Sequence, residues 1–180
     1  MGIEIAIRIG LTADIDILAG IDHDACTLFV RAGLDLDLPT EHEVTLAERE
    51  RWLTCLAAGT VLIAVDRTGA DVGFAAVGLR DAEQFLDQLS VRVSSMGQGI
   101  GTALLRASMR MAMNRGGQAL WLTTYNHLSW NRPYYERHGF VLVSPEQCGE
   151  ELRSELAFER RCLPRPEQRV VMRKNLGARP

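Results

Sequence analysis

The stretch that decides the fold is LSVRVSSMGQGIGT, residues 89–102. It begins as an apolar, β-branched run typical of a strand and becomes glycine-rich at Gly97. After it, small and apolar side chains recur at spacings of three and four residues, the pattern of a helix with one buried face. These side chains are Ile100, Ala103, Leu104, Ala107, Ser108 and Met111. The sequence therefore predicts a strand, a glycine loop and a helix in direct succession.

The glycine loop has the composition of an anion-binding site. The first N–H groups of a helix have no partner within the helix, and the helix dipole adds partial positive charge there. Because glycine has no Cβ, a phosphate can approach its backbone closely. We interpret the loop as a pyrophosphate cradle formed by Gly97, Gln98, Gly99, Ile100, Gly101 and Thr102. The glycines alone leave open a second interpretation, a tight turn without a ligand.

Two better-known phosphate loops do not fit this stretch. A P-loop needs a lysine followed by serine or threonine after its glycines, and here Thr102 directly follows Gly101. A dinucleotide-binding fingerprint needs a third glycine where Thr102 stands, and it should follow the first strand of a βαβ unit. A nucleotide-dependent oxidoreductase is therefore disfavoured.

The chain after this helix adds a second pattern. Residues 119–124, ALWLTT, are typical of a buried strand. A polar loop and a short helix follow, up to His138. Gly139 then predicts the end of that helix, and residues 140–143 predict another strand.

Together the two patterns resemble the GCN5-related N-acetyltransferase (GNAT) superfamily. The cofactor loop of that family reads Arg/Gln-x-x-Gly-x-Gly/Ala, and a Tyr-Glu-x-x-Gly-Phe-like sequence follows after one helix and one strand. Here the corresponding sequences are MGQGIG, residues 96–101, and YERHGF, residues 135–140. Three residues depart from the family pattern: Met96 replaces the usual Arg or Gln, Asn131 stands where a small residue is usual, and Leu128 stands where an Asn is common.

The resemblance implies an α/β fold with a central mixed, mostly antiparallel sheet flanked by helices, in a single domain over residues 1–180. The predicted strands are 4–9, 60–65, 72–79, 83–93, 119–124, 140–143 and 169–173. The predicted helices run from a cap at Thr12 or Asp14 to about Ala32, over 45–56, after the glycine loop, before Gly139 and over 146–161. In the helix over 45–56, the side chains expected to face inward are Leu46, Trp52, Leu53 and Leu56.

The resemblance also implies an activity. We expect an acetyl-CoA-dependent N-acetyltransferase that moves an acetyl group directly from coenzyme A to a primary amine of a small molecule or peptide. Acetyl-CoA would be its co-substrate, bound by the loop 97–102, by Asn131 and by the backbone of Leu89 and Val91, where an amide polarises the thioester carbonyl. Tyr135 would lie near the sulfur and donate a proton to the leaving thiolate.

The general base is not defined by the motifs. The family often has a glutamate near the position of Phe85, which cannot accept a proton. Asp87 on the same strand, or a water relay, is the predicted base. The missing glutamate and Met96 leave open an alternative function, a non-catalytic CoA-binding or sensing module on the same fold.

Charge is distributed unevenly along the chain. The formal net charge is −3, yet residues 1–50 contain 11 acidic and 3 basic residues, which gives −8. Such an acidic segment disfavours nucleic acid as a partner. In the family this segment forms one wall of the acceptor cleft, so the charge favours a cationic acceptor amine, although solvated surface carboxylates are an equally good interpretation.

Further features of the sequence concern membrane spans, cellular location, metal binding and oligomeric state. No apolar run approaches the ~20 residues of a membrane span. The cysteines are scattered, which favours reduced thiols and a cytoplasmic location over a disulfide framework; they are Cys26, Cys55, Cys148 and Cys162. Asp22, His23, Asp24 and Cys26 are close in sequence, but no second cluster completes a set of four ligands, so no metal site is predicted. A homodimer is an open alternative to a monomer.

Overall fold

A computed structural model describes residues 5–177. The strands are β1 (Ala6–Ile9), β2 (Val61–Val65), β3 (Asp71–Arg80), β4 (Glu83–Val91), β5 (Ala119–Tyr125), β6 (Val141–Val143) and β7 (Arg169–Asn175). The α-helices are α1 (Ile15–Arg31), α2 (Glu43–Ala57), α3 (Ile100–Asn114), α4 (Arg132–Arg137) and α5 (Glu150–Cys162). The chain groups into two compact units, one up to Gly78 together with Leu86–Met111, the other Leu79–Phe85 together with the chain from Ala112 onward.

The strands form one seven-stranded sheet in the order β1-β2-β3-β4-β5-β7-β6. The pairs β1–β2, β2–β3, β5–β7 and β6–β7 are antiparallel, whereas β4–β5 is parallel. β1 is an edge strand, as its alternating sequence predicts; Glu4, the first residue of the predicted strand, lies outside the described residues. The predicted fold class, a mixed α/β sheet flanked by helices, is confirmed.

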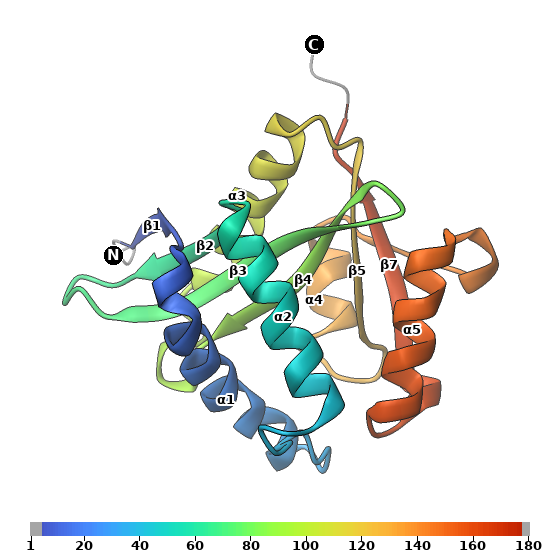
Figure 1. Cartoon of the computed structure of the whole chain (residues 1–180), viewed down its shortest axis with the longest axis horizontal. Helices are drawn as coiled ribbons and strands as arrows, with labels where there is room; N and C mark the ends of the chain where they lie inside the picture. The colour runs from blue at the N-terminus through green and yellow to red at the C-terminus, as the bar shows by residue number, and fades with distance from the viewer. Residues whose placement is uncertain (1–4, 178–180) are drawn as a thin grey trace. The chain divides into compact units, whose positions relative to one another are not determined.

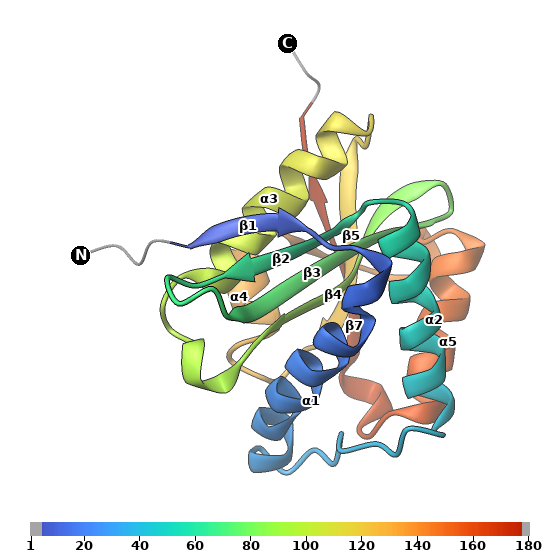
Figure 2. The same ribbon diagram turned by 60° about the vertical axis from the view of Figure 1, so that its left-hand side comes forward.

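The first unit has helices on both faces of its part of the sheet. α1 and α2 cover one face, and their side chains form a core with β2 and β3 (Figures 1 and 2). The buried members of this core are Leu18, Ile21, Trp52, Cys55, Leu56, Val61, Ile63, Phe74 and Ala76. α3 packs against the other face, where a Cβ on Gly73 would lie 3.2 Å from Leu104 of α3. The apolar stripe of α3 thus faces the sheet, with Leu104 fully buried.

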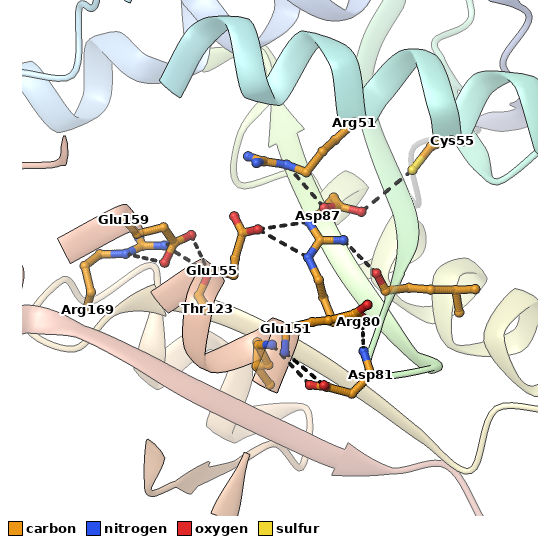
Figure 3. A network of polar contacts seen from close by, with 12 residues as sticks. Arg51, Cys55, Arg80, Asp81, Asp87, Thr123, Glu151, Glu155, Glu159 and Arg169 are labelled. Carbon is orange, nitrogen blue, oxygen red and sulfur yellow. Dashed lines mark hydrogen bonds and ion pairs between the residues drawn. The ribbon is translucent and has the colours of Figure 1, made fainter. Parts of the chain in front are cut away.

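In the second unit, β5, β7 and β6 carry α5 on one face. Phe85, Cys148, Leu152, Leu156 and Val171 form its core. Two ion pairs fix α5 to the sheet: Glu155 contacts Arg80 at 3.1 Å, and Glu159 contacts Arg169 at 2.7 Å (Figure 3). The hydroxyl of Thr123 also donates to Glu159. Because these charges are largely buried, each pair holds its members in one geometry, and losing one partner would strand the other.

Several predicted boundaries differ from the structure for local reasons. α2 begins at Glu43, two residues early, because the His42 side chain caps it by accepting from the Val44 N–H at 3.2 Å. β4 ends at Val91 because residues 93–95 form a 3-10 turn. The last predicted helix begins at Glu150, four residues late, because residues 145–147 form a separate 3-10 turn.

Other details of the prediction were wrong. Asp14 occupies the N-cap position of α1, one of the two predicted positions, but its side chain makes no cap bond to that helix and instead pairs with Arg8 at 2.7 Å. On α2, Trp52 and Leu56 are buried as predicted, but Leu46 and Leu53 are exposed. The inward stripe of α2 is therefore narrower than the spacing of its leucines suggests.

The start of α5 is held by a reciprocal contact with the turn between β3 and β4. The Asp81 carboxylate accepts the N–H groups of Glu151 at 2.9 Å and Leu152 at 3.1 Å, and the Glu151 carboxylate accepts the Asp81 N–H. A Cβ on Gly149 would lie 2.0 Å from the Asp81 carboxyl carbon. The Asp81 carboxylate therefore caps α5 from a distant segment of the chain, and glycine at 149 makes room for it.

We predict that Asp81→Asn lowers the free energy of unfolding by ~1 kcal/mol, because the amide can accept only one of the two cap bonds. Asparagine also tolerates the positive φ of 52° at this position. Gly149→Ala should destabilise as well, and the double variant should lose less than the sum, since both changes disrupt one contact. Urea unfolding measures this, with Asp35→Asn, an exposed loop carboxylate, as control. Additive losses would contradict a shared contact.

Candidate functional site

The glycine loop joins the end of β4 to the start of α3. Gly97 and Gly99 have left-handed backbones with φ of 74° and 82°, which glycine adopts without strain. A Cβ at either position would meet no atom within 4 Å, so the space beside both glycines is open. At the start of α3 the Ala103 N–H donates to the Gly99 carbonyl at 3.0 Å. The N–H groups of the preceding residues thus belong to the N-terminal end of a 15-residue helix.

Neither Gln98 nor Met96 brings a charged side chain to the glycine loop. The Gln98 amide donates to the Ser94 carbonyl at 3.3 Å, which links the loop to the 3-10 turn before it. Met96, at the position of the family's Arg or Gln, is half-buried and has no charge to offer a phosphate. The recognition of an anion here would therefore depend on backbone donors.

The strand before the loop supplies Leu89 and Val91. Leu89 is half-buried, whereas Val91 is buried on the α3 side of the sheet, beside Gly73. The start of β4, up to Phe85, belongs to the second unit, and there Gln84 and Phe85 pair with β5. Leu89 and Val91 come later along the strand, in the first unit.

Two carboxylates of α1 hold this end of β4, a feature that the sequence interpretation missed. Asp22 accepts the hydroxyl of Ser90 at 2.7 Å and the amide of Gln88. Asp24 accepts the Val93 N–H at 2.6 Å. The signal was present, because Asp22 lies four residues after the fully buried Leu18 and therefore on the inward face of the helix. Burial raises the pKa of the Asp22 carboxyl, and the bonds from Ser90 and Gln88 oppose that rise.

Asp87, the predicted base, is held differently. Its side chain is 2% exposed and lies 3.5 Å from the Arg51 guanidinium. The Cys55 thiol is 3.7 Å from its other oxygen (Figure 3). A Cβ on Gly78 would lie 2.2 Å from the same oxygen, so glycine at 78 leaves room for the carboxylate. Asp87 therefore occupies a charged, closely packed position under α2.

Consecutive side chains of β4 point to the same helical layer. Asp87 contacts α2 and Gln88 contacts α1, although neighbours on a regular strand point to opposite faces. Such a break in alternation is typical of a β-bulge, which re-aims side chains, often beside active sites.

The second unit holds Tyr135 and Asn131. The Tyr135 ring packs edge-to-face against Tyr134 and Phe140, with centroids 5.2 Å and 5.6 Å apart. Burial raises the pKa of Tyr135 above its ordinary value, so the phenol keeps its proton at neutral pH. Asn131 precedes α4, and its carbonyl accepts the Tyr135 N–H at 3.1 Å. The predicted residues thus fall into two groups, Asp87, Leu89, Val91 and the loop in the first unit, Tyr135 and Asn131 in the second.

The side chains of Asp22, His23, Asp24 and Cys26, which are close in sequence, do not gather around one point. Asp22 and Asp24 turn to β4, whereas His23 lies 3.7 Å from Asp37. Within residues 5–177, no three His, Cys, Asp or Glu side chains gather as a metal would require. No helix in that part of the chain is long and apolar enough to cross a membrane.

Comparison with known proteins places these observations in a family context. Residues 57–142 match the model of the acetyltransferase (GNAT) domain. The match contains β4, the glycine loop, α3, Asn131 and Tyr135, and it ends before α5. α1 and most of α2 precede it.

Solved structures share the fold at low sequence identity. N-acetylglutamate synthase from Neisseria gonorrhoeae, complexed with coenzyme A and N-acetyl-glutamate, matches 98% of this chain with a TM-score of 0.69 and 17% identity. This chain spans only 36% of that enzyme. PaiA N-acetyltransferase from Thermoplasma acidophilum, in complex with coenzyme A, matches 96% of this chain and 99% of its own, with a TM-score of 0.67 and 15% identity.

A GNAT-family acetyltransferase from Staphylococcus aureus Mu50 matches 97% of this chain and 100% of its own, with a TM-score of 0.71 and 14% identity. The family match over residues 57–142 and the shared fold confirm the resemblance first indicated by the two motifs. Residues 57–142 are thus similar to an acetyltransferase (GNAT) domain, and the chain shares the fold of these acetyltransferase structures.

Proposed function

We propose that this protein binds acetyl-CoA at the glycine loop and transfers the acetyl group directly to a primary amine. The observation that carries the proposal is the loop itself: Gly97 and Gly99 open the space in front of the first turn of α3, inside the segment that matches the family model. Coenzyme A in the structures of two fold relatives supports the choice of cofactor.

The loop supplies the chemistry that a pyrophosphate needs. Backbone N–H groups over residues 97–102 and the dipole of α3 favour negative charge at this end of the helix. Since Met96 brings no positive charge, these backbone donors carry the binding. We propose that the backbone of Leu89 and Val91 contacts the acetyl end of the cofactor and that Asn131 contributes to its binding.

The reaction needs three events. The amine nitrogen attacks the thioester carbonyl, forms the C–N bond and loses a proton, the C–S bond breaks, and the sulfur gains a proton. A backbone N–H of Leu89 or Val91 stabilises the developing oxyanion. Tyr135, whose phenol stays protonated because its pKa is raised, donates the proton to the thiolate.

Met96 and Phe85 favour a second candidate, a CoA-binding module without turnover. Release of free thiol from acetyl-CoA in the presence of an amine panel separates the two functions. Spermidine, L-lysine, kanamycin and L-glutamate cover cationic and anionic acceptors. Thiol release above the amine-free rate supports the transferase, and binding of coenzyme A without any release supports the module.

The acceptor is proposed to be a cationic amine. Asp35, Asp37, Glu41 and Glu43 are all exposed in and beside the loop between α1 and α2. This loop is anchored by Leu34, which is 1% exposed, so the carboxylates project from a fixed segment. A surface of one charge sign concentrates ligands of the opposite sign.

We predict that Gly99→Val abolishes thermal protection by coenzyme A, which is ~2.7 kcal/mol at 100 times the dissociation constant. The branched side chain would occupy the place of the phosphate. Gly69→Val is the matched control, because Gly69 has a φ of 84° and equally open surroundings in the β2–β3 turn. Both variants carry similar backbone strain, so only Gly99→Val should lose protection. Equal protection in the two variants contradicts the cradle.

For Tyr135 we expect Tyr135→Phe to keep the affinity for coenzyme A and to lower kcat by roughly 10- to 1000-fold, since one proton donor is lost. Tyr134→Phe, a change of the adjacent ring, should leave kcat nearly unchanged. Steady-state kinetics with the best amine of the panel gives the comparison. Full activity of Tyr135→Phe would make Tyr135 a packing residue only.

The acidic loop predicts salt dependence. KM for a cationic amine should rise with ionic strength because salt screens exposed charges. Asp35→Asn with Asp37→Asn should raise KM and flatten that dependence, while Glu167→Gln, an exposed carboxylate elsewhere, should do neither. A best acceptor that is anionic, or a KM that ignores salt, would show that the loop serves only solvation.

A further inference from the structure

The buried face of α1 presents a carboxylate to the strand that precedes the glycine loop. Asp22 lies between Leu18 and Cys26 in a row with a spacing of four residues, and this row faces the sheet. Its Oδ1 accepts from Ser90 at 2.7 Å and from Gln88. Gln88 also donates to Ser90 at 3.0 Å, so the three side chains form one closed set of hydrogen bonds.

This set surrounds the residue whose backbone is proposed to polarise the thioester. Gln88 and Ser90 are the direct neighbours of Leu89 in β4, and all three belong to the first unit together with the loop. The Asp22 carboxylate is therefore hydrogen-bonded to both sequence neighbours of Leu89. No such placement follows from the family motifs, since Asp22 precedes the segment that matches the family model.

The bonds of Asp22 leave one of its oxygens available. Oδ2 is 3.7 Å from the Cys26 thiol, which is a weak donor, and within residues 5–177 no other hydrogen bond to it occurs. Asp87 differs, because it faces the Arg51 guanidinium at 3.5 Å. A guanidinium stabilises the ionised carboxylate and so weakens it as a proton acceptor. Asp22 has only neutral hydrogen-bond partners.

The charged groups around Asp22 come from each neighbouring element. His23 lies beside it on α1, and Glu48 of α2 and Asp37 of the loop act on the adjacent Cys26. Arg92, directly after β4, reaches the Gly20 carbonyl and the Asp71 carbonyl, and no bond from it to Asp22 occurs among the described residues. Burial raises the pKa of the Asp22 carboxyl above its ordinary value, and a carboxylate with a raised pKa is a stronger proton acceptor.

We propose that Asp22 is the general base of the acetyl transfer, taking a proton at Oδ2 from the ammonium group of the acceptor, with Gln88 and Ser90 positioning its carboxylate. The proposal rests on the transferase function proposed above. The N–H bond of the ammonium breaks and an O–H bond forms on Asp22, which later releases this proton to solvent. The neutral amine then attacks the thioester carbonyl, and the second proton that nitrogen loses balances the proton gained by the sulfur.

The test compares Asp22→Asn with Asp87→Asn in the full chain. Spermidine, L-lysine and kanamycin are assayed by thiol release from pH 6 to pH 9. Asparagine at 22 can still accept from Ser90 and Gln88, so the fold and the protection by coenzyme A should remain. We expect kcat at pH 7 to fall ~100-fold or more. The rate of the variant should then rise about tenfold per pH unit, because only acceptor that is already deprotonated reacts.

Asp22→Asn is expected to lower kcat but not the free energy of unfolding at pH 7. Because folding raises the pKa of Asp22, the folded state holds more protons than the unfolded state between the unfolded pKa of ~3.9 and the higher pKa of the folded state. The free energy of unfolding therefore falls as pH rises through this range. Asp22→Asn removes this loss, so the variant should be at least as stable as the wild type at pH 7. Ser90→Ala should reduce kcat by less than Asp22→Asn, as a positioning residue would.

Each result has a defined meaning. A wild-type pH profile in Asp22→Asn overturns the proposal. It is also overturned if Asp87→Asn, rather than Asp22→Asn, acquires the tenfold rise per pH unit, in which case Asp87 is the base as the sequence predicts. Failure of the transferase function is separate, because it appears in the wild type as binding of coenzyme A without thiol release from any amine.

Discussion

The site depends on the way α1 fixes the end of β4. Asp22 holds Ser90 and Gln88, Asp24 holds the Val93 N–H, and Arg92 reaches back to the Gly20 carbonyl. These contacts hold the end of the strand against α1. The two left-handed glycines then turn the chain so that α3 begins directly after the loop. The first turn of a helix can bind an anion only when it is held in position and the space in front of it is open. Residues of the first unit meet both conditions.

The contact between α1 and β4 also includes the carboxylate that we propose as the general base, Asp22. If Asp22 were only structural, a neutral side chain would serve as well, since a buried carboxylate with neutral partners lowers stability at neutral pH. Asp87 and Asp14 show the usual solution, a carboxylate beside a guanidinium. The different surroundings of Asp22 are typical of a functional group, because active sites often contain groups whose environment shifts their pKa.

Much of the fold could be predicted from the sequence, because the signals were local. The periodicity of α3 and the glycines at either end of short elements identified the order of strands and helices. The wrong predictions for α2, its inward side chains and its first residue, depended on tertiary contacts and capping. Leu46 and Leu53 are exposed, and His42 caps the helix. The glycine loop could be identified from the sequence because Gly97 and Gly99 adopt left-handed backbones that favour glycine. The contact of Asp22 with β4 could not, since it joins residues 68 positions apart.

The central claim is that backbone amides of residues 97–102 bind the pyrophosphate of coenzyme A. Two-dimensional amide NMR of the ¹⁵N-labelled protein during titration with coenzyme A tests it directly. Strong amide N–H shifts should be concentrated in Gly97, Gly99 and Gly101. Gly69, in the open turn between β2 and β3, should not shift. Saturable binding that leaves the loop amides unshifted and moves resonances elsewhere would contradict the account.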